Sequence, residues 1–363
     1  YYPKNKENMH DAVKRECLAV RESLGILDAS TLGKIDLQGP DTVKFLNMIY
    51  TNAWSQLDIG SCRYGIMCNE HGMIFDDGVT TRIGEHHYHM TTTTGGAARV
   101  MSWLEEFLQT EWLDMKVFCT SVTEQWSVLS ISGPNSRAFL QDLTDINLSK
   151  ESFPFMKFRE GQVCGIKARV FRISFTGELS YEVNVPARYG KFVWEQFIEH
   201  GKKYNITPYG TETMHVLRAE KGFIIVGQDT DGSATPIDMN MDWIVSKKKE
   251  DFLGKRSFTR PDTIRPDRKK FVGLLVNDKK TVLPEGSHIV EKALKQPPMK
   301  MLGHVTSSYY SPTLGHPIAL AMLQDGLNRM GEQVLIPLMS GKVVEATVSD
   351  TIFYDKEGMR NNE

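Results

Sequence analysis

Ile35-Asp36-Leu37-Gln38-Gly39-Pro40-Asp41 alternates apolar and polar residues up to a Gly-Pro pair and leads to Phe45-Leu46. A second run of the same kind, Leu129-Ser130-Ile131-Ser132-Gly133-Pro134-Asn135, leads to Phe139-Leu140. In both copies the alternation predicts a strand. We expect Asp41 or Asn135 to cap the first turn of a helix that carries the Phe-Leu pair inward. The repeat therefore predicts two duplicated halves, each made of a strand, a turn and a helix.

Apolar spacing predicts further helices and strands outside the repeat. Helices are expected at residues 9–24, 96–108, 188–204 and 211–221, the last of which ends at Gly222 as a C′ glycine. Strand-like runs cover residues 117–122, 126–131 and 168–175. Because strands and helices do not alternate regularly, an α+β fold is favoured over a doubly wound sheet.

The length of 363 residues exceeds what one hydrophobic core usually organises, so we expect two or three domains. Residues 1–52 and 134–246 are assigned to one discontinuous α+β domain, and residues 53–133 to a second α+β domain. Residues 247–270 carry ten Lys or Arg against four acids, which favours a solvated linker over a dedicated anion site. Residues 271–363 are short stretches separated by Gly and Pro, which predicts an all-β barrel or jelly roll.

The composition excludes several classes of protein. A charged fraction of 24% and a net charge of −2 are ordinary for a globular protein and give no general attraction to nucleic acid. The five cysteines include no Cys-x-x-Cys pair, which argues against a disulfide framework and against a structural zinc site. No run approaches the ~20 apolar residues of a membrane span, and no signal-peptide pattern opens the chain. We therefore expect a cytoplasmic protein without membrane contact, part of a longer polypeptide or a trimmed one because it begins at Tyr1.

Two adjacent carboxylates open a β-prone stretch in Gly72-Met73-Ile74-Phe75-Asp76-Asp77-Gly78. Neighbouring residues on a strand point to opposite faces, so only one of Asp76 and Asp77 can face water cheaply. The other must meet a partner or a ligand. One of the two is therefore a candidate site residue, and a plain turn built from Gly and Asp is the alternative.

Motifs for metals, nucleotides and nucleophiles are missing. His86, His87 and His89 lie beside Glu85, but His86 opposes the other two on a strand, so a polar hairpin tip is favoured over a metal site. No Gly-x-Gly-x-x-Gly, phosphate loop or Gly-x-Ser-x-Gly elbow is present, so the chain should hold neither NAD nor FAD in a Rossmann domain of its own. These absences favour positioned carboxylates that act on a bound organic cofactor.

Four ordered stretches indicate the family. They are Arg63-Tyr64-Gly65-Ile66-Met67 with Gly72 to Asp77, Ser174-Phe175-Thr176-Gly177-Glu178-Leu179-Ser180-Tyr181-Glu182, Leu217-Arg218-Ala219-Glu220-Lys221-Gly222, and Met241-Asp242-Trp243 ahead of Asp251-Phe252-Leu253-Gly254-Lys255. In this order and at these separations they resemble the aminomethyltransferase family, which contains the T-protein of the glycine cleavage system. Within that family, residues 29–34, 90–96, 207–212 and 303–310 resemble the C-terminal half of the α subunit of heterotetrameric sarcosine oxidase.

The resemblance implies a three-domain cloverleaf around a central channel that holds tetrahydrofolate. It implies that Asp77 is the catalytic carboxylate beside the reacting folate nitrogen. There it would accept or orient a proton while the nitrogen attacks an imine carbon. Asp76 would be its structural partner, turned toward a backbone N–H group or toward solvent.

Glu182 is expected to recognise the pterin ring. Ser180, Glu182 and Asn184 share one face of an alternating strand, and a carboxylate suits the two parallel N–H donors of the pterin edge. A solvent-facing position is the alternative. The resemblance adds two residues that line the folate pocket: Tyr64, whose ring could stack on the pterin, and Phe175, where many relatives have Tyr.

Three further positions follow from the resemblance. Trp243 matches a channel-lining aromatic, with core packing as the alternative for it and for the other two aromatics. Arg218 would pair with the glutamate tail of folate, with a structural salt bridge as an equal alternative. Glu178, in the turn before Glu182, is a weaker candidate. The T-protein pattern has Asn where this chain has Thr93 or a neighbour, which loosens the analogy to ammonia-releasing chemistry.

The implied function is a one-carbon transfer domain that traps the imine carbon of oxidised sarcosine on tetrahydrofolate, giving 5,10-methylenetetrahydrofolate and glycine. Flavin and NAD are then expected only on other segments or subunits of the assembly, which would be partners of this chain. One alternative is a free-standing aminomethyltransferase that accepts a lipoyl-bound aminomethyl group. The other is a folate-binding module without turnover.

Overall fold

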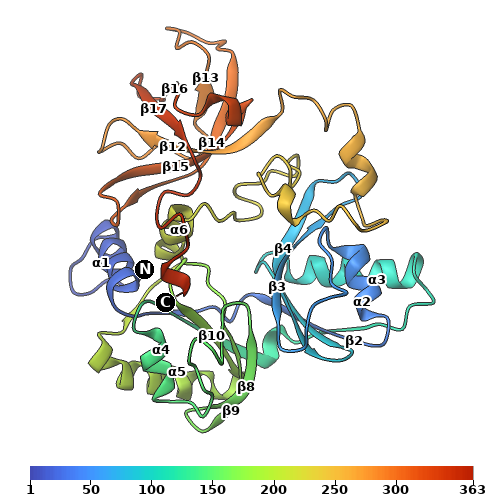
Figure 1. The fold of residues 1–363 in the computed structure, drawn as a ribbon. Coiled ribbons are helices and arrows are strands. Elements are labelled where there is room, and N and C mark those ends of the chain that lie inside the picture. The colour runs from blue at the N-terminus through green and yellow to red at the C-terminus, as the bar shows by residue number, and fades with distance from the viewer. Residues whose placement is uncertain (363) are drawn as a thin grey trace.

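The computed structural model describes residues 1–362, which form two open sheets with helices and one closed barrel, arranged around a centre (Figure 1). The α+β fold and the C-terminal barrel predicted from the sequence are both confirmed. No helix in this part of the chain is long and apolar enough to cross a membrane.

The first sheet has six strands in the order β11-β1-β7-β10-β9-β8. Their bounds are β1 (Gly25–Asp28), β7 (Trp126–Ser132), β8 (Phe158–Val163), β9 (Ile166–Phe171), β10 (Ser180–Pro186) and β11 (Thr207–Pro208). The helices of this part are α1 (Met9–Glu22), α4 (Ser136–Gln141), α5 (Gly190–Gly201) and α6 (Thr211–Glu220). Apolar residues of α4 and α5 pack on Tyr181, Val183 and Val185 of β10. The polar residues that alternate with these three therefore line the opposite face, as predicted.

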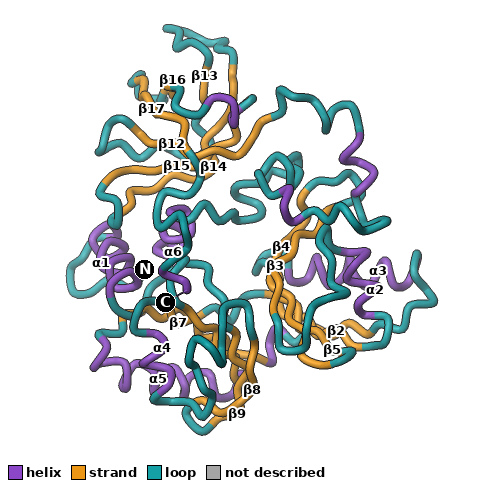
Figure 2. Tube along the Cα trace, in the orientation of Figure 1, coloured by secondary structure: helices purple, strands orange, loops and turns teal. Residues whose placement is uncertain are grey.

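The second sheet has five antiparallel strands in the order β3-β4-β5-β2-β6. Their bounds are β2 (Gly33–Gln38), β3 (Cys62–Cys68), β4 (Ile74–Gly84), β5 (His87–Thr92) and β6 (Phe118–Ser121), and the helices are α2 (Thr42–Ile49) and α3 (Ala97–Thr110). Leu37 and Met90 of the sheet pack against Leu46 of α2 and Leu104 of α3 in one core. α4 and α5 cover the outer face of the first sheet, and α2 and α3 cover that of the second (Figure 2). The faces that these four helices leave uncovered look toward the centre, where α1 and α6 lie between the first sheet and the barrel.

The barrel closes in the strand order β12-β15-β14-β13-β16-β17. Its strands are β12 (Lys269–Val276), β13 (His288–Val290), β14 (Met301–Ser311), β15 (His316–Gln324), β16 (Gln333–Pro337) and β17 (Val343–Ser349). β12 pairs with both β15 and β17, which leaves no free edge within the barrel. After β17 the chain returns to the first sheet, where the C-terminus lies near the N-terminus (Figure 1).

The strand-turn-helix repeat is confirmed in both copies, because β2 leads into α2 and β7 leads into α4. All four Phe and Leu side chains of the repeat have no exposed surface. The predicted side-chain caps are wrong. Asp41 accepts from the backbone N–H of Lys116 at 2.9 Å, and Asn135 donates to Ser23 at 3.3 Å. Each of the two side chains bonds instead to a residue distant in the sequence and does not cap its own helix.

The other predicted helices all form, with α1, α3, α5 and α6 each within a few residues of its expected bounds. Gly222 has a φ of +68°, which is the left-handed backbone expected of the glycine that ends α6. The strand predicted at residues 168–175 forms only in part, because β9 runs from Ile166 to Phe171.

Sheet membership differs from the predicted domain boundaries. The expected first domain, residues 1–52 and 134–246, includes β2 and α2, but β2 pairs with β5 and β6 of the second sheet. The expected second domain, residues 53–133, includes β7, but β7 pairs with β1 and β10 of the first sheet. Strand pairing joins residues far apart in the sequence, so the two copies of the repeat lie in different sheets.

The basic segment 247–270 is held against the second sheet's helices and is not a purely solvated linker. The Lys249 ammonium donates to the backbone carbonyls of Asn47, Tyr50 and Asn52 at the end of α2, with a distance of 3.0 Å to Asn52. Burial lowers the pKa of Lys249 to about 7. A lysine on the last carbonyls of a helix compensates their partial negative charge, which is the reason for this contact.

Candidate active site

Asp77 lies on β4, on the face of the second sheet that its helices leave uncovered. Tyr64 on the neighbouring strand β3 donates a hydrogen bond of 2.6 Å to the Asp77 carboxylate. Burial raises the pKa of Asp77 to about 7, with the Tyr64 hydrogen bond opposing this effect and the charge of Asp76 adding to it. A carboxyl group that titrates near neutral pH and is held in place by a hydroxyl is suited to general acid–base work.

Asp76 points the other way and is fully buried. Its carboxylate accepts from the backbone N–H of Asp77 at 2.8 Å, and from the backbone N–H and hydroxyl of Thr93 at 3.3 and 3.1 Å. A Cβ atom on Gly96 would lie 1.7 Å from the Asp76 carboxylate, so only glycine fits there. Asp76 therefore fastens the start of β4 to the turn before α3, and Thr93 is one of its two partners.

Glu182 lies on β10, on the uncovered face of the first sheet, between Phe171 on β9 and Ser130 on β7 in the register. Within residues 1–362 no donor forms a hydrogen bond to its carboxylate. Burial raises the pKa of Glu182 to about 7, and the Lys34 charge opposes this effect. A partly buried carboxylate without a partner is expensive unless a ligand supplies donors.

Lys34 is a residue that the sequence reasoning missed. It lies on β2 with no exposed surface, and its ammonium donates to the carbonyls of Ser30 and Leu32 at 2.8 Å each. Burial lowers the pKa of Lys34, while nearby carboxylates including Glu182 raise it. The signal was available, because a lysine that alternates with Ile35 and Leu37 must lie on the face opposite that apolar pair.

The three predicted aromatics lie in different surroundings. Tyr64 is the Asp77 partner, so its hydroxyl has a defined role in addition to any ring contact. Phe175 is 36% exposed and stacks on Phe223 with ring centroids 6.0 Å apart. Trp243 is 70% exposed, on the short helix η4 (Asp242–Ile244), which excludes core packing as the reason for this residue.

The contacts of Arg218 favour the structural salt bridge over pairing with the folate tail. It has no exposed surface and pairs with Asp229, which is itself buried, at 2.5 Å. The same guanidinium donates to Ser307 of the barrel at 2.6 Å and to the carbonyl of Phe223 at 2.9 Å. The structural salt bridge is therefore the role the structure gives to Arg218. The sequence could not decide this, because Asp229 lies outside the helix.

The histidine cluster is not simply a polar hairpin tip. His89 is 1% exposed and contacts Asp36 of β2 at 2.6 Å, while His87 contacts the same carboxylate at 2.9 Å. Arg169 of the first sheet lies 3.5 Å from that carboxylate, so the cluster helps to join the two sheets. No group of three or more His, Cys, Asp or Glu among the described residues is arranged to hold a metal ion.

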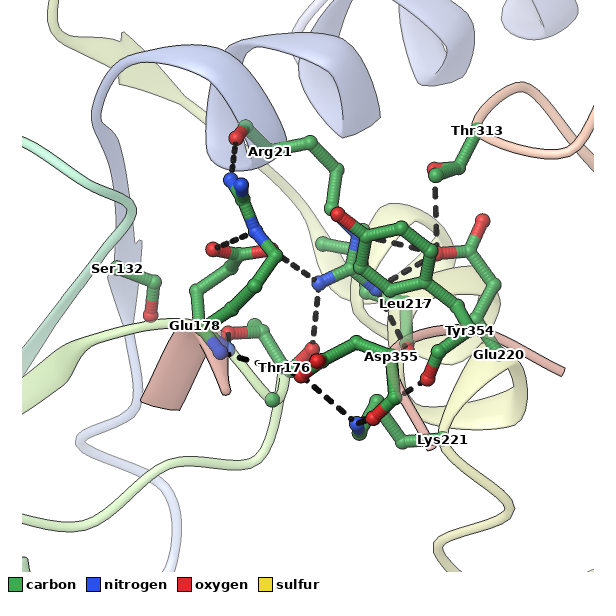
Figure 3. A network of polar contacts seen from close by, with 12 residues as sticks. Arg21, Ser132, Thr176, Glu178, Leu217, Glu220, Lys221, Thr313, Tyr354 and Asp355 are labelled. Atoms are coloured by element: carbon green, nitrogen blue, oxygen red, sulfur yellow. Dashed lines mark hydrogen bonds and ion pairs between the residues drawn. The ribbon is translucent and has the colours of Figure 1, made fainter. Parts of the chain in front are cut away.

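Glu178 is buried in an ion-pair network and does not line the uncovered face as a free carboxylate. It accepts from Arg21 of α1 at 2.9 Å, and Arg21 also pairs with Glu220 of α6 at 2.6 Å (Figure 3). Nothing in the sequence pattern indicated this network, because its members come from segments far apart in the chain.

Comparison with known proteins identifies two family matches along the chain. Residues 1–249 match the GCVT N-terminal domain, and residues 269–355 match the glycine cleavage T-protein C-terminal barrel domain. The structure of glycine cleavage system aminomethyltransferase T from Bartonella henselae superposes with a TM-score of 0.83, over 95% of this chain and 90% of that one, at 24% identity. The three-part architecture is therefore one that this aminomethyltransferase shares.

Two groups of proteins are similar to this chain in sequence, namely sarcosine oxidase α subunits and aminomethyltransferases. The chain is 51% identical, over its whole length, to the sarcosine oxidase subunit alpha of Corynebacterium sp. (strain U-96) and covers 38% of that protein. It is 40% identical to the corresponding subunit of Rhizobium meliloti (strain 1021), of which it covers 37%. The aminomethyltransferase of Thermotoga neapolitana is 30% identical, and the match covers 95% of this chain and 90% of that protein. The chain thus spans well under half the length of the sarcosine oxidase subunits it matches.

Proposed function

The chain belongs to the glycine cleavage T-protein family, and on that premise we propose that it is a folate-dependent one-carbon transfer domain of a sarcosine oxidase α subunit. The observation that carries the proposal is a pair of carboxyl groups, Asp77 and Glu182, on the two sheet faces that helices leave uncovered. Burial raises the pKa of each to about 7. Structural carboxylates of this chain, such as Asp76 and Glu178, are by contrast fully bonded.

The residues fit tetrahydrofolate at the pterin end. The Glu182 carboxylate lacks a donor from the described part of the protein, and the pterin edge offers two roughly parallel N–H groups. Satisfying a desolvated carboxylate with two charge-assisted bonds favours binding, because the carboxylate is otherwise left without a partner. Lys34 keeps positive charge near Glu182 and so favours its ionised form, which is the form that accepts both bonds.

Asp77 would carry out the proton chemistry. Bound tetrahydrofolate supplies the nitrogen that takes up the one-carbon unit from the imine of oxidised sarcosine. The Asp77 carboxylate, fixed by Tyr64, would accept the proton that this nitrogen loses and pass it to the departing amine. The second folate nitrogen would bond to the same carbon as the carbon–nitrogen bond to glycine breaks, and its proton would complete the amine of glycine. Phe175 and Trp243, both partly or largely exposed, are the aromatic surfaces left for contact with the rest of the folate. Flavin and NAD would be held by other segments or subunits, which also oxidise sarcosine.

Two alternative functions of the same site would require different ligands or partners. A free-standing aminomethyltransferase needs an aminomethyl group delivered on a lipoylated carrier protein, and a scaffold needs only folate. The sequence identity of 51% to a sarcosine oxidase subunit favours the oxidase assignment over the 30% identity to an aminomethyltransferase.

The test uses the intact protein with sarcosine as substrate, with and without tetrahydrofolate. We expect equal sarcosine consumption in both cases, with formaldehyde as the product without folate and 5,10-methylenetetrahydrofolate with it. Folate binding with unchanged formaldehyde release would indicate a scaffold. Turnover only when a lipoylated aminomethyl carrier is added would assign the chain to glycine cleavage.

A further inference from the structure

The segment that follows the last barrel strand is bound to the first sheet by charged groups (Figure 3). The backbone N–H groups of Phe353 and Tyr354 donate to the carbonyl of Glu220 at 2.9 and 3.0 Å. Lys221 donates to the carbonyls of Tyr354 and Asp355, and the Tyr354 ring lies 4.5 Å from the Arg21 guanidinium. We call residues 350–362 the return segment.

Arg360 of the return segment contacts Glu178, which lies four residues before Glu182. Its Nε atom donates to both Glu178 oxygens at 2.9 Å, and its other end donates to the carbonyl of Arg21. Glu178 is thereby fixed between two guanidinium groups, those of Arg21 and Arg360. Charge-assisted contacts of this kind are stronger and more directional than neutral hydrogen bonds.

Asn361, the next residue, bonds to Arg172, a second residue close to the start of β10. Arg172, directly after β9, donates to the Asn361 side chain at 3.1 Å and also to its carbonyl. The same guanidinium donates at 3.2 Å to the carbonyl of Ser180, the first residue of β10. Arg172 is 1% exposed, so these bonds are formed in a buried setting.

These contacts lie near Glu182 in the fold but do not include its side chain. Ser180 is the first residue of its strand, Glu178 lies in the turn just before that strand, and Arg172 follows Phe171, the partner of Glu182 on β9 in the register. The return segment therefore bonds to the residue directly after β9 and to a residue in the turn before β10, the two strands that meet at Glu182 and Phe171. Because a strand is stiff, the position of its first residues sets where the Glu182 side chain points.

We propose that Arg360 and Asn361 are positioning residues for folate recognition, which hold β10 and β9 so that Glu182 meets the pterin edge. This inference rests on the proposed function. It gives the return segment a role in ligand affinity in addition to its structural contacts with α6 and the first sheet. Residues that support a ligand-binding side chain from behind commonly change affinity without touching the ligand.

The experiment measures tetrahydrofolate affinity by calorimetry in the intact protein for Arg360→Ala, Glu182→Gln and the double variant. We expect Arg360→Ala to weaken binding roughly tenfold, the scale of coupling within one hydrogen-bond network. In the Glu182→Gln background the same change should weaken binding less than about twofold, because its effect acts through Glu182. Arg329→Ala is the matched control, since Arg329 makes a similar ion pair, with Glu332, on the barrel.

Equal weakening in both backgrounds would show a general structural effect and overturn the inference alone. If the unaltered protein binds no tetrahydrofolate, the proposed function fails and the inference falls with it. Asn361→Ala keeps the test open if Arg360→Ala does not fold, because it removes only the side-chain bond to Arg172. It should weaken binding in the same Glu182-dependent manner, and unchanged affinity would count against the inference.

Discussion

The Tyr64 hydroxyl donates a 2.6 Å hydrogen bond to the Asp77 carboxylate, which joins neighbouring strands of the second sheet at the candidate active site. Burial and the nearby charge of Asp76 both favour protonated Asp77, and this bond is what opposes them. The Tyr64 hydrogen bond therefore lowers the pKa of Asp77 from what burial alone would set. The pairing gives Tyr64 a role that a purely apolar pocket residue would lack.

Tyr64→Phe should shift the pH dependence of folate-coupled transfer to higher pH. The substitution keeps the burial and removes the hydrogen bond that lowers the Asp77 pKa, so this pKa rises above about 7. A rate profile measured from pH 5 to 9 should move in that direction while its high-pH plateau changes much less. A profile that moves to lower pH would show that Asp77 does not set it.

Asp77→Asn should slow formation of 5,10-methylenetetrahydrofolate by about 10²–10⁴-fold, the usual contribution of a positioned acid–base group. Folate affinity should remain nearly unchanged, because the pterin contact is assigned to Glu182. In the oxidase assembly sarcosine should still be consumed, with the carbon released as formaldehyde. Stopped-flow product analysis distinguishes these outcomes.

Asp76→Asn is the neighbouring control. Its carboxylate accepts only from the protein, so the change should lower thermal stability more than it lowers transfer. If Asp76→Asn abolished transfer while Asp77→Asn left it intact, the roles of the two carboxylates would have to be exchanged.

Binding of tetrahydrofolate should weaken as the pH falls below about 7 and should release a proton. Burial raises the folded-state pKa of Glu182 to about 7, so the free carboxyl is largely protonated below that pH, whereas the bound form must be ionised to accept N–H bonds. Calorimetry in buffers of different ionisation enthalpy measures the released proton. Glu182→Gln should remove the proton release and weaken binding by roughly 1.5–3 kcal/mol. Identical proton release in this variant would place its origin elsewhere.

Arg218→Ala should reduce the free energy of unfolding by about 3–5 kcal/mol, because it leaves Asp229 as a buried charge without its partner. Any loss of folate affinity should be the same for folates with and without the glutamate tail. Asp229→Ala should have a comparable effect on stability, and the double variant should cost less than the sum of the two. A loss specific to the tailed ligand would restore the tail-binding role.

The sequence predicts those features that depend on neighbouring residues. Alternation placed Glu182 on the polar face of its strand, and the Gly-Pro repeat located β2 with α2 and β7 with α4. The features that failed depend on distant partners. Asp41 bonds to Lys116 instead of capping its helix, and Arg218 pairs with Asp229 instead of facing a ligand. The alternation of Lys34 with Ile35 and Leu37 was a local signal for its position, but its relation to Glu182 exists only when the two sheets come together.

Residues 29–32 and 122–125 connect strands of the two sheets directly, and these connections run side by side. Ala29 donates to the carbonyl of Val128 at 2.9 Å, and Val122 donates to that of Lys34 at 2.8 Å. At the opposite edges the sheets meet through backbone bonds, from Cys62 to Met156 at 2.8 Å and from Phe158 to Gly60 at 2.9 Å, through a side-chain bond from Lys157 to Ser61 at 2.6 Å, and through a small apolar cluster. The two sheets are thus joined by continuous backbone on one side and by non-covalent contacts on the other. A rotation about the two connections that widens the gap between Asp77 and Glu182 would break the backbone bonds at the opposite edges, so hydrogen exchange of the Cys62 and Phe158 amides would report it.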